Sequence, residues 1–60
     1  MSSNHNQVIG SRLKELRLER GLKISEMAES LYISRAYVGL LEKGTKKASS
    51  KVLEKYADFF

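Results

Sequence analysis

Apolar residues recur at helical spacing near both ends of the chain. Ile9, Leu13 and Leu16 follow one another at positions i, i+4 and i+7, which predicts a helix over residues 7–20 that Gly21 ends. A second series predicts a last helix that Ser49 caps, and its apolar positions are Val52, Leu53, Tyr56 and Phe60. We expect the first and last helices to pack against each other and to close a small core.

The middle of the chain, residues 24–43, has the pattern of two short helices joined by a tight corner. Ile33 lies in the corner, and Ser34 is a natural N-cap for the second helix. The inward faces of the two helices are marked by Met27, Ala28, Leu31, Val38 and Leu41. A segment of this length cannot bury itself, so the flanking helices must complete the core. The pattern predicts an all-α fold, a small bundle of four or five short helices.

Length and composition limit the chain to one small domain. Sixty residues without cysteine allow a single modest core and no disulfide or thiolate chemistry. No apolar run approaches the roughly 18 residues of a membrane span, and the N-terminus lacks the pattern of a signal peptide. We expect a soluble cytoplasmic protein, with a flexible tail over residues 1–6 and the domain over residues 7–60.

Positive charge is concentrated in one part of the chain. The net charge is +4, from 11 Lys and Arg against 7 Asp and Glu. Residues 34–51 hold five of the basic residues and one acidic residue, whereas opposite charges nearly cancel on either side. Such an excess over a helix and the loop after it is typical of a nucleic-acid footprint. A solvated lysine surface is the alternative interpretation.

The chain offers no set of residues suited to catalysis or metal binding. His5 is the only histidine, Asp58 is the only aspartate, and cysteine is absent. A nucleophile with its base, or a metal cage, needs several such side chains at one place. The segments that contain glycine match no phosphate-binding loop. We therefore expect no enzymatic activity, no cofactor and no metal.

A series of short motifs, in order and at fixed spacing, runs through most of the chain. They are Ile9-Gly10-x-Arg12-Leu13, Arg17, Arg20-Gly21-Leu22, Met27-Ala28, Ile33-Ser34-Arg35, Glu42-x-Gly44, Ser49 and Leu53. With these motifs, residues 9–60 resemble the lambda-repressor-like (Xre, Cro/C1) helix-turn-helix family. The resemblance implies a DNA-binding module of a bacterial or phage transcriptional regulator, most often a repressor, located in the cytoplasm with the nucleoid.

The resemblance also implies a partner and an assembly. The partner would be double-stranded DNA, with the helix over residues 34–43 in the major groove of a pseudo-palindromic operator. The working form would be a homodimer that associates through a region beyond residue 60. In the family another helix normally follows, so the chain is expected to be cut short at its C-terminal side. The alternative is a protein-interaction module of the same fold, antitoxin-like or binding a regulatory partner, with little DNA specificity.

The outward face of the second middle helix is the predicted reading surface. On a helical wheel with Val38 and Leu41 facing the core, the outward residues are Ala36, Gly39, Leu40 and Lys43, with Arg35 and Tyr37 at the two edges. Ala36 and Leu40 suit thymine methyl groups, and Arg35 suits guanine or a phosphate. An alternative assigns Leu40 to a protein interface. The predicted base contacts are Ser34, Arg35, Ala36, Gly39 and Leu40.

The predicted phosphate contacts surround this surface. Lysines of the exit loop match the family's phosphate clamp, and contacts to phosphate set position and salt dependence without choosing sequence. The full set is Arg17, Lys23, Ile24, Tyr37, Lys43, Thr45, Lys46 and Lys47. In the family, the arginine at position 17 also pairs with the glutamate near the end of the recognition helix, here Glu42. We therefore expect an ion pair that ties the first helix to the third.

The sequence departs from the family at the start of the second helix and at the corner. Lys23 and Ile24 stand where Ser or Thr followed by Gln is usual, so the usual capping side chain and a polar DNA contact are missing. Ser25 could instead cap a helix that starts one or two residues later, and Lys23 could contact a phosphate. Tyr32 stands where glycine usually adopts a positive φ. Either the corner is strained by about 1 kcal/mol or more, or its backbone differs from the usual one.

Overall fold

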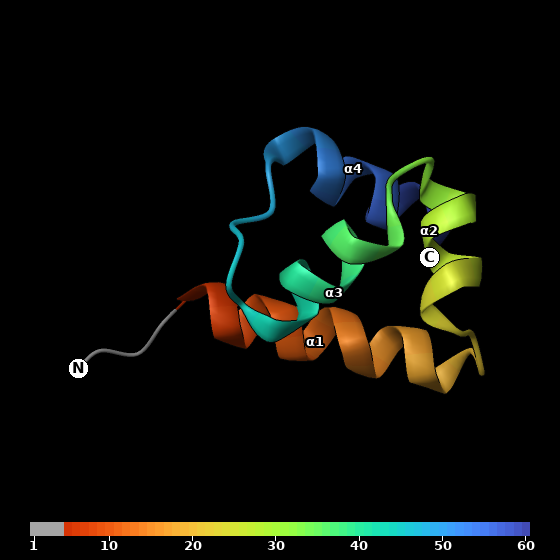
Figure 1. Ribbon diagram of the computed structural model, residues 1–60, viewed down its shortest axis with the longest axis horizontal. Helices are drawn as coiled ribbons and strands as arrows, with labels where there is room; N and C mark the ends of the chain where they lie inside the picture. The colour runs from red at the N-terminus through yellow and green to blue at the C-terminus, as the bar shows by residue number, and fades with distance from the viewer. Residues whose placement is uncertain (1–4) are drawn as a thin grey trace.

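Four α-helices form the part of the chain that the computed structural model describes, residues 5–60. They are α1 (His5–Glu19), α2 (Ile24–Leu31), α3 (Arg35–Lys43) and α4 (Ser50–Phe59), and these residues contain no strand. In Figure 1, α1 runs along one side, α4 lies opposite, and α3 passes between them with α2 across one end. The predicted all-α fold is confirmed, with four helices in this range.

The first helix uses a different face from the one that the apolar pattern predicts. Its buried residues are Gly10, Leu13 and Arg17, whereas Ile9 is 39% exposed and Leu16 is only partly buried. The reason is the close approach of α3, because a Cβ atom on Gly10 would lie 2.3 Å from the Leu41 carbonyl oxygen. A search for periodic apolar residues cannot detect this buried face, because two of its three residues are a glycine and an arginine.

The start of α1 lies two residues earlier than the sequence predicts. His5 and Asn6, which the sequence analysis assigns to a flexible tail, are the first residues of this helix. They border a groove of about 580 Å³ together with Ile9 and residues at the start of α4, among them Leu53. Residues 1–4, the rest of the predicted tail, lie outside the described residues.

Three of the helices end in the same way. Gly21, Tyr32 and Gly44 each have a positive φ, of 69°, 59° and 80°. After each, the backbone N–H donates to the carbonyl five residues back, and the residue itself donates three residues back, as in a Schellman motif. Tyr32 thus has the conformation that glycine adopts in the other two helices. The corner is of the usual kind and strained, which decides between the two alternatives left open by the sequence.

The core lies where the four helices meet. Most of its buried side chains come from α2 and α3, with one from α1 and two from α4; they are Leu13, Met27, Ala28, Leu31, Val38, Leu41, Val52 and Tyr56. The expectation that the first and last helices close the core against each other is wrong, because α4 packs chiefly against α2 and leaves Leu53 38% exposed. The Nζ atom of Lys55 donates to the Leu31 carbonyl at 3.1 Å and satisfies the end of α2.

The ends of α1 and α4 meet at an aromatic cluster. The guanidinium carbon of Arg20 lies 5.0 Å from the centre of the Phe60 ring and 5.7 Å from that of Phe59. The two phenylalanine rings meet edge to face at 5.0 Å. These contacts join the two helices at one end only. Within residues 5–60, no helix is both long enough and apolar enough to cross a membrane.

Candidate nucleic-acid interface

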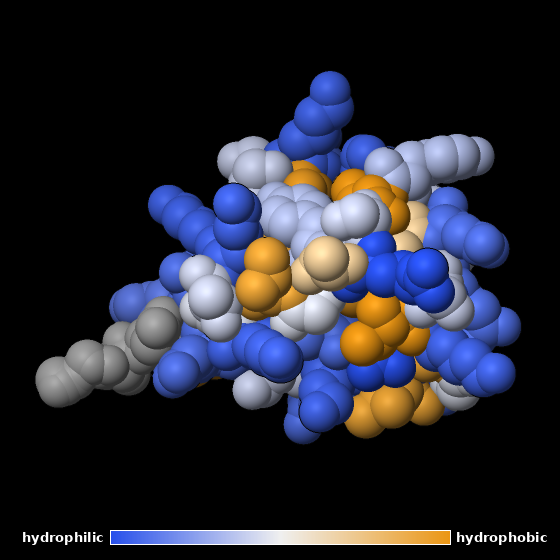
Figure 2. Space-filling view, in the orientation of Figure 1, coloured by the Kyte–Doolittle hydropathy of each residue, from blue (hydrophilic) through white to orange (hydrophobic). Residues whose placement is uncertain are grey.

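The third helix presents two different faces. Ser34 caps it, since its hydroxyl oxygen accepts a hydrogen bond from the Tyr37 backbone N–H at 3.0 Å. Its inward face buries Val38, Leu41 and Glu42. On its outward side Ser34, Arg35, Ala36 and Leu40 are exposed and Gly39 is partly exposed, so all five predicted base contacts lie at the surface. Figure 2 shows a small apolar area over α3 with hydrophilic surface around it.

An ion pair fixes this helix to α1. The guanidinium of Arg17 donates from Nε to one oxygen of Glu42 at 2.7 Å and from Nη2 to the other at 3.0 Å. Its Nη1 donates to the Leu22 carbonyl at 2.8 Å. Both side chains are more than nine-tenths buried, and the hydrogen bond to Glu42 raises the pKa of Arg17 above its usual value. The ion pair predicted from the sequence is therefore present, buried and bidentate.

The start of α2 lacks the usual capping side chain. Lys23 is the N-cap residue, and a lysine side chain has no oxygen that could accept from the helix. The carboxylate of Glu26 reaches back and accepts the Lys23 backbone N–H at 2.8 Å, so half of a capping box remains. The Ile24 side chain packs on the core. A phosphate could therefore meet Ile24 only at its backbone N–H, whereas the Lys23 side chain is exposed.

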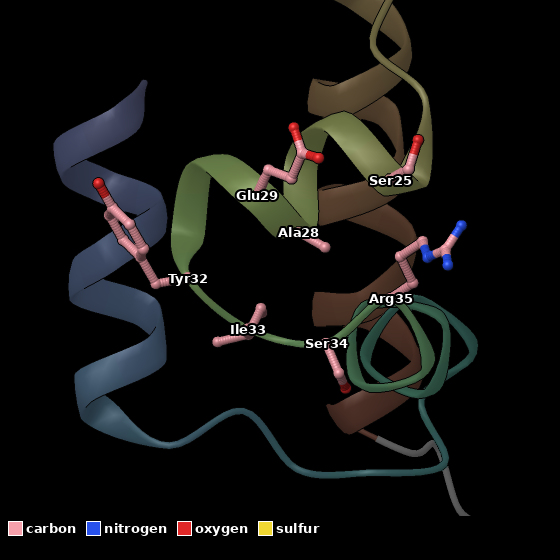
Figure 3. A pocket seen from close by; sticks show the side chains of 7 residues that line it. All are labelled: Ser25, Ala28, Glu29, Tyr32, Ile33, Ser34 and Arg35. Atoms are coloured by element: carbon pink, nitrogen blue, oxygen red, sulfur yellow. The ribbon is translucent and has the colours of Figure 1, made fainter.

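A hollow of about 740 Å³ lies outside the corner between α2 and α3. Figure 3 shows Ser25 and Glu29 of α2 on one side and Ser34 and Arg35 on the other. The Tyr32 ring, 89% exposed, points to the side of α4, where it lines a smaller hollow with Lys55 and Phe59. Glu29 places a negative charge beside the predicted reading surface. The sequence analysis did not single it out.

The loop after α3 carries the exposed lysines. Lys43, Thr45, Lys46 and Lys47 are exposed, whereas Gly44 is buried against α1. A Cβ atom on Gly44 would lie 2.6 Å from the Gln7 Cα atom, so the loop begins pressed against the first helix. The backbone N–H groups of Thr45 and Lys46 donate to the Leu40 carbonyl. The predicted phosphate contacts of this loop thus lie together at the C-terminal end of α3, whereas Tyr37 lies in the first turn of the helix with its side chain half-buried.

A further, small hollow of about 140 Å³ lies between α1 and the outward side of α3. Its lining residues are Lys14, Arg17, Ile24, Gly39, Glu42 and Lys43. Arg17 is also a predicted phosphate contact, but each of its three side-chain nitrogen atoms donates a hydrogen bond within the protein, so only two of its five N–H donors remain for a phosphate. Lys14 is the residue that the sequence analysis missed here. Its position one helical turn before Arg17, on the same side of α1, is the signal that points to it.

One polar group of the core has no partner. The hydroxyl of Tyr56 is buried and forms no hydrogen bond with the described residues. Burial raises the pKa of Tyr56 to about 12, and the negative charge of Glu42 adds to the shift. The buried polar side chains of the described core are thus one ion pair, which is satisfied, and one phenol, which is not.

The residues of the described range contain no group of three or more His, Cys, Asp or Glu side chains that could hold a metal ion.

Comparison with known proteins agrees with this geometry. Residues 13–60 match a family model described as helix-turn-helix (HTH_3). One relative, an uncharacterized HTH-type transcriptional regulator of Bacillus subtilis (strain 168) named YqaF, is 41% identical over 46 residues, which are 77% of this chain. The matched segment makes up 60% of the length of that relative. No solved structure matches the chain.

Proposed function

We propose that this chain, which belongs to the Xre-type, lambda-repressor-like helix-turn-helix family, is the operator-reading module of a repressor. Members of this family are DNA-binding domains of transcriptional regulators and not enzymes. α3 enters the major groove, and Arg35, Ala36 and Leu40 meet the base edges. Two copies bind as a two-fold pair on a pseudo-palindromic operator, with their recognition helices about 34 Å apart. The regulator acts in the cytoplasm.

The observation that carries this proposal is the pair of faces on α3. The inward face is held by buried side chains and by the bidentate ion pair to α1, so the helix has a fixed direction. The outward face carries exposed residues that the fold does not use, and exposed lysines follow directly after it. A rigid helix with a free surface beside a cluster of cations suits a polyanion with a groove.

The readout that we propose is mixed. Ala36 and Leu40 contact thymine methyl groups, Arg35 donates to a guanine or a phosphate, and Ser34 still has its hydroxyl hydrogen to donate. Phosphate contacts come from Lys23, the Ile24 backbone, the Tyr37 hydroxyl and the loop of residues 43–47. With roughly four to six neutralised phosphates in each domain, log K falls with log salt concentration at a slope of about −4 to −5.

The test is a selection from a randomised duplex pool with the 60-residue chain, followed by titration of selected and unselected DNA at two salt concentrations. Enrichment of a pseudo-palindrome with thymine-rich positions, bound well above the unselected pool, supports the proposal. Equal weak binding to both pools that disappears with salt contradicts it. That outcome favours the second candidate, a protein-interaction module, for which the partly exposed apolar Leu40 is the supporting observation.

A triple variant separates these two candidates. Replacing Lys43, Lys46 and Lys47 with alanine removes three exposed cations that have no structural partner within residues 5–60. We expect this variant to fold as the parent does and to lose DNA binding. A protein partner held through Leu40 would still bind it. Retention of DNA binding by the triple variant would contradict the phosphate role of the loop.

A further inference from the structure

The small hollow between α1 and α3 lies directly over the glycine of the reading helix. A Cβ atom on Gly39 would meet nothing within 4 Å, so the space over this residue is open. The hollow continues from there between Lys14 of α1 and Lys43 of α3, with Arg17 and Glu42 in its wall. A group that approaches α3 from outside can therefore come close to its backbone at this one position.

The charges around the hollow favour an anion. Arg17 and Glu42 neutralise each other in their bidentate pair. Lys14 and Lys43 are exposed, and neither forms an ion pair or a side-chain hydrogen bond with any described residue. Two uncompensated ammonium groups thus stand on opposite walls, one on each helix. A neutral base edge would leave both of them unmatched.

The width of the major groove decides which part of DNA reaches this place. An α-helix with its side chains is about 10 to 12 Å wide, and the groove is about 12 Å wide. When α3 fills the groove, residues beside it on another helix face the sugar–phosphate backbone at the rim and not the bases. Lys14 is such a residue, because α1 lies alongside α3 (Figure 1).

On the basis of the proposed function, we infer that Lys14 is a DNA-backbone contact. The hollow over Gly39 receives one phosphate of the operator, and the phosphate accepts hydrogen bonds from the ammonium groups of Lys14 and Lys43. Gly39 is then the residue that lets the backbone of DNA approach α3, in addition to any contact with a base. This adds a residue of α1 to an interface that the sequence assigned, on that helix, to Arg17 alone.

The test compares Lys14→Ala with Arg12→Ala in the 60-residue chain. Both changes remove one positive charge from α1, but Arg12 lies two residues away, exposed, and paired with Glu15 outside the hollow. The probes are a fluorescein-labelled duplex of mixed sequence and the duplex selected from the random pool, and the readout is fluorescence anisotropy over a range of salt concentrations. Urea unfolding of each variant verifies that its fold is retained.

We expect Lys14→Ala to weaken binding to both duplexes by the same factor and to make the salt slope about 0.9 less steep, the value for one lost phosphate contact. Its deficit relative to Arg12→Ala should then shrink about threefold to fourfold between about 50 and about 200 mM salt. Lys14→Arg should restore the slope. Equal slopes for Lys14→Ala and Arg12→Ala, or a loss confined to the selected sequence, would overturn the inference.

Failure of this inference differs from failure of the proposed function. If the triple lysine variant loses DNA binding while Lys14→Ala behaves like Arg12→Ala, the domain binds DNA but the hollow receives no phosphate. If the parent chain shows no DNA binding beyond weak, salt-sensitive association and no enriched sequence, the proposed function is contradicted and the inference with it.

Discussion

The inward and outward faces of α3 are built on different principles. On the inward face, Val38, Leu41 and Glu42 are buried, and each has a specific neighbour in another helix or in the core. On the outward face, Arg35, Ala36 and Leu40 are exposed and contribute little to the fold. A change on the first face should therefore alter stability and DNA binding together, whereas exchange of the exposed side chains of Arg35, Ala36 or Leu40 should alter chiefly DNA binding.

Two glycines mark the same contrast. A Cβ atom on Gly10 would collide with the backbone of α3, at 2.3 Å from one carbonyl oxygen and 2.7 Å from the next. A Cβ atom on Gly39 would meet nothing. The first glycine is required by the packing of α1 on the inward face, and the second is compatible with the fold but not required by it. The same substitution at the two positions should have opposite effects on stability.

The largest expected effect is at the ion pair. Arg17→Ala leaves the carboxylate of Glu42 buried without its partner, which should lower the free energy of unfolding by about 3 to 5 kcal/mol. For a domain of this size, such a loss is most of the whole free energy of unfolding, so DNA binding should be lost as well. Urea unfolding followed by circular dichroism measures the change, and anisotropy measures the binding.

Two controls sharpen this experiment. Arg12→Ala breaks an exposed pair and should change stability by less than about 1 kcal/mol. Replacing both Arg17 and Glu42 with methionine removes the unpaired charge and should recover most of the loss. If Arg17→Ala unfolds at the parent's urea midpoint yet binds no DNA, the arginine acts on DNA alone and the pair does not support the fold.

The buried phenol of Tyr56, on α4, should make the core against which α3 packs sensitive to high pH. Its pKa is about 12 when folded and about 10 when unfolded, so between these values the unfolded chain loses a proton that the folded chain keeps. Stability is unaffected below pH 10 and falls as pH rises from 10 to 12, by at most about 2.7 kcal/mol at 1.36 kcal/mol per unit. Y56F should lack this part of the decline, since lysine titration is common to both proteins. Parallel stability curves would show that burial of the phenol has no such effect.

Gly10→Ala should destabilise the domain by about 1 to 3 kcal/mol, because the added methyl group forces α1 and α3 apart. The change is measured as a shift of the thermal or urea midpoint. A midpoint equal to that of the parent would mean that the two helices can separate freely. The close approach seen at this glycine would then have no energetic importance.

Gly39→Ala should do the reverse and stabilise the folded chain by about 1 kcal/mol, since alanine is a better helix former and meets no neighbour. This is the smallest expected effect, and its sign is what matters. A loss of stability would show that the outward face is under a structural constraint that the geometry does not reveal. The DNA affinity of the same variant then shows how closely DNA approaches α3 at position 39.

Helix positions could be predicted from the sequence because their signals are local. Periodic apolar residues placed α2, α3 and α4, and the caps at Ser34 and Ser49 are formed as predicted, with each hydroxyl accepting a backbone N–H. The buried side of α1 could not be predicted in the same way. Gly10 and Arg17 are buried only because α3 lies against them, and that is a property of the tertiary structure.

The candidate site divides in a similar way. A helical wheel was enough to place Arg35, Ala36 and Leu40 on the outward side of α3. Lys14 and Glu29 could not be found in this way, because they lie on other helices and come close to the proposed reading surface only in the folded chain. For Tyr32, the sequence left strain and a different backbone as alternatives, and the positive φ of this residue in the folded chain decides for strain.

The contacts of Arg17 also bear on what can be moved from one protein to another. A single guanidinium joins α1, the α1–α2 connection through the Leu22 carbonyl, and the far end of α3. The segment of α2 and α3 therefore cannot be transferred to another protein by itself. Without α1, the carboxylate of Glu42 would lose its partner and the apolar side chains that pack on α1 would be exposed to solvent. A graft that keeps residues 5–60 and exchanges only residues 35, 36, 39 and 40 would preserve every one of these contacts. The smallest interchangeable unit of this domain is thus a set of outward side chains and not a helix.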